Sequence, residues 1–264
     1  MNNIPVVIFS GGTGTRLKEM TEFLPKPLIP VGGKPLIWHI MKIYSHFGHS
    51  DFVLALGYKQ EQFKLFFRNY DIINRDVTIF TGLREVSRTV FHAPISEQWS
   101  VTLIDTGEKT LKEGRLKRLE RFISEDVFML CYGDSVADIN IPALLDFHFA
   151  HKKMVTITGV FPVSKFGEIK YSNENTVIQF EEKPQKEGCL ASAGFFVCNK
   201  EIFKWIKDDG ISEFETTLKD IAAAGELMVY KHTGFFGCMD TLREMGELQD
   251  LWDNGKAKWK IWED

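Results

Sequence analysis

The chain has 264 residues, of which 44% are hydrophobic and 26% charged, and its formal net charge is −4. This balance is typical of a globular protein and argues against nucleic-acid and membrane-surface partners, because such surfaces attract an excess of basic residues. No apolar run reaches the roughly 18 residues that span a bilayer, and the N-terminus lacks the pattern of a signal peptide. We therefore expect a cytoplasmic protein without a prosequence.

The first informative stretch is a short apolar segment followed by three glycines. Residues 4–9 read Ile-Pro-Val-Val-Ile-Phe, and residues 10–17 read Ser-Gly-Gly-Thr-Gly-Thr-Arg-Leu. A short run rich in β-branched residues that ends at glycine predicts a buried strand. Glycines just after a strand let the backbone approach a ligand and point N–H groups at one anion, so we expect a polyphosphate site. Arg16 and Lys26 would add positive charge there.

Two familiar phosphate-binding motifs fit this loop poorly. A dinucleotide fingerprint needs G-x-G-x-x-G, but Leu17 stands where the third glycine belongs, which disfavours a Rossmann oxidoreductase. A P-loop needs Lys-Ser or Lys-Thr after its second glycine, and the chain has no such pairing. A purely structural glycine turn stays open on the evidence of the loop alone.

The first eighty residues alternate between strand and helix patterns. After the loop, apolar spacing predicts helices over 35–47 and 60–70, and short apolar runs predict strands over 52–56 and 77–80. Strand, helix, strand, helix and strand in this order are typical of a parallel, doubly wound sheet. Residues 81–100 have no clear period, and we interpret them as a long excursion, either a hairpin or a cover.

The rest of the chain continues the alternation, with one change of pattern. Over 166–180, short alternating runs flank an Asn-Glu-Asn turn and predict a β-hairpin. The other predicted strands are 101–105, 127–132, 155–161, 193–198 and 227–231, and the other predicted helices are 115–123, 142–151, 200–207, 214–224 and 241–252. We expect an α/β fold: a Rossmann-like, mostly parallel sheet flanked by helices, with a smaller β-rich C-terminal lobe.

Two aspartates are candidate metal ligands. Asp134 follows the most apolar predicted strand, and in an open parallel sheet ligands bind beyond the carboxyl ends of the strands. A divalent metal would offset the charge of a polyphosphate bound beside the glycine loop, which makes Asp134 the natural first ligand, although a turn-capping role stays open. Asp240 alone suggests a helix cap, because Asp before Thr-Leu-Arg suits a helix N-terminus.

The cysteines and histidines carry no metal-binding pattern. Cys131, Cys189, Cys198 and Cys238 lack the spacing of a zinc site, so we expect free thiols in a reducing compartment. The histidines, including the pair on the predicted helix 142–151, fit ordinary surface or core positions.

Motifs in sequence order resemble those of the sugar-1-phosphate nucleotidyltransferases. They are Gly-Gly-Thr-Gly-Thr-Arg-Leu at 11–17, Pro-Lys-Pro at 25–27, Gly-Gly-Lys-Pro at 32–35, Tyr-Gly-Asp at 132–134, Glu-Lys-Pro at 182–184, Ala-Gly-Phe-Phe at 193–196 and Met-Asp-Thr at 239–241. The resemblance implies one nucleotidyltransferase domain over 1–264, with a nucleotide-binding core at 1–160 and an acceptor-binding and C-terminal part at 161–264. Runs at 36–42, 101–107, 114–118, 132–138 and 251–259 are similar to the cytidylyl-transferring branch of the family.

The resemblance also implies an activity and a set of roles. It implies a Mg²⁺-dependent homo-oligomeric enzyme that transfers CMP from CTP to a sugar 1-phosphate, with glucose 1-phosphate as the expected acceptor, giving a CDP-sugar and pyrophosphate. The implied catalytic residues are Arg16, Lys26, Asp134 and Asp240, the last two as magnesium ligands. The implied nucleotide-binding residues are Gly11, Gly12, Gly14, Thr15, Arg16, Lys26 and Arg115. The implied acceptor-binding residues are Gly167, Glu182, Lys183 and Ser192.

The chain departs from the branch pattern at positions expected near the acceptor. They are Ser135, Lys165, Lys170, Ser192 and Ala193. A serine cannot reach a sugar hydroxyl as the family's asparagine does, and a lysine in place of aspartate inverts a charge, so a different phosphorylated acceptor is an alternative. A non-catalytic regulator that binds a nucleotide or a sugar phosphate is a third interpretation, against which the complete pair of aspartates argues.

Overall fold

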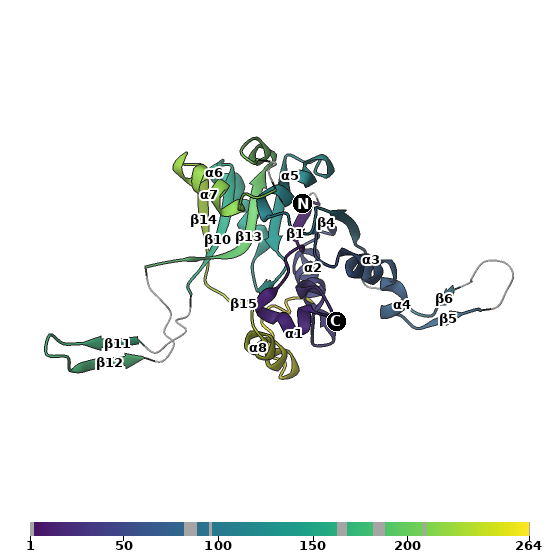
Figure 1. The fold of residues 1–264 in the computed structure, drawn as a ribbon, viewed down its shortest axis with the longest axis horizontal. Coiled ribbons are helices and arrows are strands. Elements are labelled where there is room, and N and C mark those ends of the chain that lie inside the picture. The colour runs from purple at the N-terminus through teal and green to yellow at the C-terminus, as the bar shows by residue number, and fades with distance from the viewer. Residues whose placement is uncertain are drawn as a thin grey trace.

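The computed structural model describes residues 3–81, 89–94, 97–162, 168–181, 188–207 and 210–263. Its central layer is a seven-stranded sheet with the order β14-β10-β13-β8-β1-β4-β7 (Figure 1). In that order the strands are Leu227–His232, Val155–Val160, Ala191–Asn199, Val127–Tyr132, Val6–Phe9, Asp51–Leu56 and Ser100–Asp105. Only β13 runs antiparallel to its neighbours within this sheet, which confirms the expected mostly parallel α/β fold.

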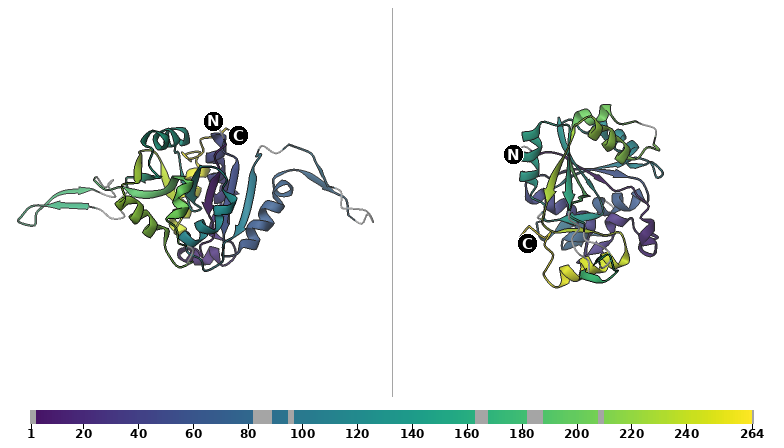
Figure 2. Two further views of the ribbon diagram at one scale, coloured as in Figure 1. Left: turned by 90° about the horizontal axis from the view of Figure 1, so that it is seen from above. Right: turned by 90° about the vertical axis from the view of Figure 1, so that its left-hand side faces the viewer.

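Alternation along each strand sends side chains into two hydrophobic cores. On β1, Val6 and Ile8 face one core, whereas Val7 and Phe9 face the other. The first core is covered by α2 (Leu36–His46), α3 (Gln60–Arg68), α6 (Ile141–His151) and α8 (Leu242–Asp253). The second is covered by α5 (Lys112–Leu119) and α7 (Phe214–Ala223). Figure 2 shows the sheet with helices on both sides.

The third strand expected in the parallel sheet is a wrong prediction. β5 (Val77–Ile79) pairs antiparallel with β6 (Thr89–Phe91) in a hairpin outside the central sheet, and β7 lies beside β4 instead. A short apolar run predicts an extended backbone but does not specify its partner, which is why the pattern misled. Residues 81–100, which we interpreted as a hairpin or a cover, supply the second strand of this hairpin, β6. Residues 82–88 and 95–96 lie outside the described residues.

Two other expected helices differ in extent or type. The helix expected over 115–123 begins earlier, as α5, and ends in a 3-10 turn at Glu120–Phe122. The helix expected over 200–207 is a 3-10 helix over Lys200–Lys204. The remaining described elements are 3-10 turns at Thr15–Leu17 and Lys26–Leu28, helices α1 (Lys18–Thr21) and α4 (Tyr70–Asn74), and strands β2 (Pro30–Val31), β3 (Lys34–Pro35), β9 (Ser135–Ala137) and β15 (Phe236–Cys238). No helix in the described ranges has the length and apolar character needed to cross a bilayer.

Two hairpins project from opposite sides of the molecule (Figures 1 and 2). One is β5–β6, and the other is formed by β11 (Glu168–Tyr171) and β12 (Val177–Glu181), as the alternating pattern predicted. Ile169, Ile178 and Phe180 on β11–β12 are 54%, 70% and 62% exposed. We call this hairpin the β11–β12 arm. A two-stranded ribbon is at best marginally stable in water by itself. An exposed apolar surface of this kind is also unusual on a monomeric protein.

Candidate active site

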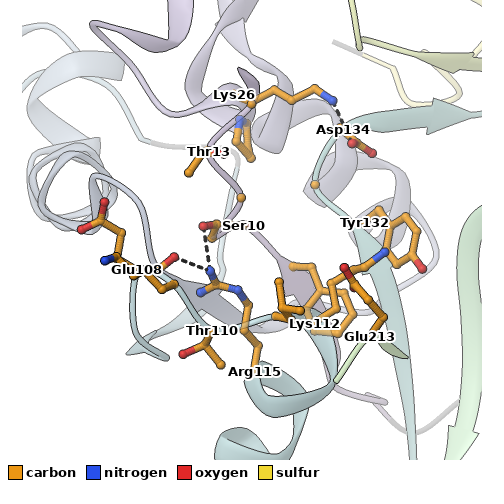
Figure 3. A pocket seen from close by; sticks show the side chains of 18 residues that line it. Ser10, Thr13, Lys26, Glu108, Thr110, Lys112, Arg115, Tyr132, Asp134 and Glu213 are labelled. Atoms are coloured by element: carbon orange, nitrogen blue, oxygen red, sulfur yellow. Dashed lines mark hydrogen bonds and ion pairs between the residues drawn. The ribbon is translucent and has the colours of Figure 1, made fainter. Parts of the chain in front are cut away.

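A pocket of about 540 Å³ lies beyond the carboxyl ends of β1, β7 and β8 (Figure 3). Its walls are the glycine loop after β1, residues 108–112 after β7, and Gly133 with Asp134 after β8. The lining also includes Phe9, Lys26, Pro27, Arg115, Tyr132 and Glu213. This is the edge of the sheet at which the sequence predicts a ligand, because parallel strands all end there.

The glycine loop needs its glycines for different reasons. Gly14 has φ +62°, and a Cβ there would lie 2.7 Å from Cγ2 of Thr21. Its carbonyl accepts a hydrogen bond from the Leu17 N–H at 2.9 Å, which starts a 3-10 turn. A Cβ added at Gly12 would meet no other atom within 4 Å, so the backbone at Gly12 is open to a ligand in the pocket.

Arg115 lies beneath the glycine loop and joins the loops that follow three strands. Its Nη1 donates to the carbonyl of Leu56, to Oγ1 of Thr106 and to the carbonyl of Gly107 at 2.8–2.9 Å. Its Nη2 donates to the carbonyls of Gly11 and Glu108 at 2.9 and 3.1 Å. The guanidinium is buried, and that burial lowers the pKa of Arg115 below its ordinary value. Arg115 therefore stabilises the shape of the loops around the pocket.

Lys26 lies between the two predicted metal ligands. Its Nζ is 2.8 Å from Oδ2 of Asp134 and 2.5 Å from Oδ1 of Asp240. Burial alone would lower the pKa of Lys26, but the two carboxylates outweigh burial and raise it above the ordinary value. Figure 3 shows the Lys26 side chain extended across the pocket toward Asp134.

A smaller cavity of about 180 Å³ adjoins Lys26, and Gly14, Thr15, Arg16 and Asp240 also line it. The Arg16 side chain is 72% exposed, and its Nη1 is 2.8 Å from Oδ2 of Asp240. Burial alone would raise the pKa of Asp240, but hydrogen bonding and charge from Lys26, with the charge of Arg16, lower it. Two cations and two carboxylates thus form one cluster, here called the Lys26 cluster (Arg16, Lys26, Asp134 and Asp240).

A short antiparallel ladder brings the two aspartates together although they are far apart in sequence. β9 pairs with β15 so that Ser135 lies opposite Cys238, and the Met239 N–H donates to the carbonyl of Asp134 at 2.9 Å. Ser135 is buried, and its Oγ donates to Oδ1 of Asp134 at 3.1 Å. Ser135 therefore supports a predicted metal ligand.

The donor set at this position suits a hard divalent cation. Ligand atoms of Asp134, Asp240 and Cys238 lie within 4.8 Å of one another. Burial, and then the neighbouring carboxylates, raise the pKa of the Cys238 thiol to about 12, so it stays protonated at neutral pH. Mg²⁺ prefers oxygen ligands, which leaves the two carboxylates as the protein donors.

The helix-cap interpretation of Asp240 is wrong, because the neighbouring residue performs that role. Thr241 is the N-cap of α8, and its side chain accepts a hydrogen bond from the Glu244 N–H at 3.2 Å. The Glu244 carboxylate accepts in return from the N–H groups of Asp240 and Thr241. Because this capping box does not use the Asp240 side chain, that carboxylate can pair with Lys26 and Arg16 beside the smaller cavity.

The expected acceptor residues are only partly described. Gly167, Glu182 and Lys183 lie outside the described residues, as does the departure at Lys165. Ser192 is exposed on β13, its Oγ accepts from the Gly194 N–H at 3.2 Å, and it does not line the pocket.

The other two departures from the family pattern also lie away from the pocket. Ala193 is buried in the core, and Lys170 is on the β11–β12 arm. The structure therefore gives no support to a changed acceptor from these described positions.

The sequence analysis gave no role to three interacting residues in or beside the pocket, Lys112, Tyr132 and Glu215. Tyr132 OH donates to Oε1 of Glu215 at 3.1 Å, and Lys112 forms an ion pair with the same carboxylate while its Nζ lies 4.8 Å from the Tyr132 ring centre. Gly194, with φ +75°, leaves room for that ring. Lys112 follows β7, so the rule that identified Asp134 could have found it; Glu215 comes from a distant helix and has no local signal.

Comparisons with known proteins agree with this geometry. The nucleotidyl transferase family pattern matches residues 5–260. A glucose-1-phosphate cytidylyltransferase from Salmonella typhimurium is 43% identical over 97% of this chain and 99% of its own length. A Bacillus subtilis protein assigned the same activity is 38% identical over 97% of this chain and 99% of its own. The structure of a Bacillus anthracis protein assigned as a glucose-1-phosphate thymidylyltransferase superposes with a TM-score of 0.69, over 98% of this chain and 97% of that one, at 18% identity.

Proposed function

The chain belongs to the nucleotidyl transferase family, and on that premise we propose that it transfers CMP from CTP to glucose 1-phosphate, giving CDP-glucose and pyrophosphate. The cytidylyl group and the glucose acceptor follow from relatives that match nearly the whole chain at 43% and 38% identity. The single structural observation that supports an active enzyme is the Lys26 cluster, in which cations and carboxylates from separate segments meet beside the glycine loop.

The nucleotide would lie in the pocket between the glycine loop and the segment after β7. The backbone N–H groups of the glycine loop, at Gly11, Gly12, Gly14 and Thr15, would bind its phosphates. Arg16 and Lys26 would neutralise the phosphate charge, and Arg115 would keep the loops in place below it. The acceptor would bind through Glu182 and Lys183, as the resemblance implies, with Lys183 on the phosphate.

The proposed reaction needs little acid–base chemistry. An oxygen of the glucose 1-phosphate attacks the α-phosphorus of CTP in line, and pyrophosphate leaves on the opposite side. The attacking phosphate is already ionised, so positioning and charge neutralisation account for the acceleration. Lys26 and Arg16 are the described cations closest to the two aspartates, and they would stabilise negative charge on the triphosphate.

We further propose that Asp134 and Asp240 hold Mg²⁺. When bound, the ion would act as a Lewis acid that offsets charge on the α-phosphate and on the leaving pyrophosphate. Support comes from the oxygen donors of the two carboxylates, whose ligand atoms lie within 4.8 Å of each other. Ser135 and the β9–β15 ladder would hold the two carboxylates side by side, in position to bind that ion.

We also infer a homo-oligomer and a cytoplasmic location. The apolar side chains exposed on the β11–β12 arm need a partner surface, and a second copy of the chain is the partner we propose. Light scattering of the wild type and of Ile178→Asp tests this. Cys131 and Cys198 are buried free thiols, which a reducing compartment keeps in that state.

Pyrophosphate release, measured with four nucleoside triphosphates and a panel of phosphorylated acceptors, tests the proposed function. We expect CTP with glucose 1-phosphate to be the best pair. Cytosine and uracil differ by an amino donor in place of a carbonyl acceptor, and a mispaired buried group costs about 1–3 kcal/mol, so kcat/KM should favour CTP over UTP by roughly fivefold to 150-fold. Equal rates with UTP, or a clearly better acceptor than glucose 1-phosphate, would contradict the proposal.

A further inference from the structure

The Lys26 ammonium lies between the same two carboxylates that a shared metal ion would contact. It contacts one carboxylate oxygen of Asp134 and one of Asp240, at 2.8 and 2.5 Å. A magnesium ion bound to the same two carboxylates would lie about 2.0–2.1 Å from an oxygen of each. The gap between two such oxygens admits only one of these cations, because a monovalent and a divalent charge so close together repel strongly.

The cluster is balanced in charge without a metal. Two carboxylates face two cations, since Arg16 also contacts Asp240 at 2.8 Å. A divalent ion added alone would leave an excess of positive charge in a partly buried site, where the Lys26 side chain is only 11% exposed. A triphosphate added alone would leave an excess of negative charge. The opposite charges of the two ligands partly cancel when both are bound, so each favours the binding of the other.

The structure also offers Lys26 an alternative partner. Lys26 lines both the large pocket beside the glycine loop and the smaller cavity beside Arg16. Phosphate oxygens arriving at the glycine loop would accept its hydrogen bonds in place of the aspartates, because ammonium–phosphate pairs are strong charge-assisted bonds. The long, flexible lysine stem permits that exchange without movement of the backbone.

We propose that Lys26 occupies the metal position in the free enzyme, so that a divalent ion binds Asp134 and Asp240 only once the nucleotide has drawn Lys26 away. The inference rests on the proposed function for the identity of the nucleotide. It assigns Lys26 two successive partners, first the aspartates and then the phosphates. It also makes Lys26 the residue that couples metal binding to nucleotide binding.

Binding of Mn²⁺ to the nucleotide-free protein, followed by the electron paramagnetic resonance signal of the free ion, tests the proposal. Lys26→Met should lower the Kd for Mn²⁺ by about tenfold or more, which corresponds to about 1.4 kcal/mol. Lys153→Met, which removes a lysine paired with the distant Glu226, is the control, and we expect a change of less than about threefold there.

A second measurement separates exchange from a merely structural role. Lys26→Met should also weaken the binding of CTP in EDTA, because the phosphates lose a cation. Tighter Mn²⁺ binding with weaker metal-free CTP binding supports the proposal. If Lys26 only holds the aspartates in position, Lys26→Met would weaken Mn²⁺ binding as well, and that result, or an unchanged Mn²⁺ affinity, would overturn it. Lys26→Gln replaces the methionine variant if the latter does not fold.

The outcome is independent of the proposed reaction. The Mn²⁺ experiment uses no nucleotide and no acceptor, so its result stands whichever substrates the enzyme takes. Turnover of CTP and glucose 1-phosphate with no effect of Lys26→Met on Mn²⁺ binding would reject only the inference. The expected Mn²⁺ effect without any such turnover would reject only the proposed substrates.

Discussion

Lys26 and Arg115 are two cations beside one pocket, and they have opposite kinds of partners. Lys26 contacts only carboxylates among its described ion pairs and hydrogen bonds. Arg115 makes its described hydrogen bonds to four backbone carbonyls and one hydroxyl, none of them charged. A carboxylate can exchange a lysine for a metal ion, whereas a backbone carbonyl left without its donor has no comparable substitute. Lys26 is therefore suited to exchange its partners when ligands bind, whereas Arg115 holds the loops around the pocket in a fixed position.

The largest expected effect comes from removing the partners of Lys26. Asp134→Asn and Asp240→Asn should each lower kcat by about 10²–10⁴-fold, because a bound metal contributes several kcal/mol to the stabilisation of the transition state. Far-ultraviolet circular dichroism should stay unchanged. Asp146→Asn, on the exposed face of α6, is the matched control and should keep full activity. Near-normal turnover in both folded variants would remove the basis for the metal assignment.

The comparison predicts that Arg115 matters more for stability than Lys26 does. Arg115→Met leaves buried carbonyls without donors and should lower the free energy of unfolding by about 2–4 kcal/mol in urea titrations. Arg118→Met is the control on the same helix, because Arg118 is exposed and donates to the Thr106 carbonyl and the Thr110 hydroxyl. We expect a loss of about 1 kcal/mol or less there. A similar loss in Lys26→Met and Arg115→Met would erase the distinction.

Arg16 tests whether the exposed cation of the cluster acts during the reaction. The positive charge of Arg16 should stabilise the transition state most, because negative charge then develops on the leaving pyrophosphate. Arg16→Ala should therefore lower kcat by about tenfold and raise the KM for CTP by a smaller factor. Arg243→Ala, which removes a comparably exposed arginine paired with Glu247, is the control. A change in KM alone would indicate uniform binding and would exclude Arg16 from the catalytic set.

The smallest expected effect is a dependence of stability on pH that is confined to the Lys26 cluster. The folded pKa of Asp240 is below its ordinary value of 3.8, so the stabilisation from this carboxylate is present above 3.8 and is lost as the pH falls through the folded pKa. The folded pKa of Lys26 is above 10.5, so its contribution is present below 10.5 and is lost as the pH rises through the folded pKa.

Urea titrations of the wild type and Asp240→Asn at several pH values check this expectation. The difference in unfolding free energy should be about 1 kcal/mol or less, because the pair is partly exposed, and it should be constant between about pH 5 and about pH 9. It should shrink at pH values below 3.8, where Asp240 becomes protonated, and again well above 10.5, where Lys26 loses its charge. A difference that changes near neutral pH would mean that another group governs this pair.

Most strands of the central sheet, and the loops that line the pocket, can be predicted from the sequence alone. Short apolar runs that end close to a glycine identified β1, β4 and β8, because a parallel strand buried on both faces is apolar along its whole length. The rule that ligands bind beyond the carboxyl ends of such strands then singled out Asp134, which lines the pocket. The resemblance to a known family, rather than any local pattern, added Asp240, because next to Thr241 it suggested only a helix cap.

Which side chains meet depends on contacts between segments that are far apart in the chain. The β9–β15 ladder brings together Asp134 and Asp240, 106 positions apart in the numbering, and it gives Ser135 its place beside a predicted metal ligand. β5 and the β11–β12 arm have strand patterns, but their partners lie outside the central sheet. Local sequence specifies how a segment bends and which face is apolar, whereas pairing and the exchange of cation partners depend on contacts between segments far apart in the chain.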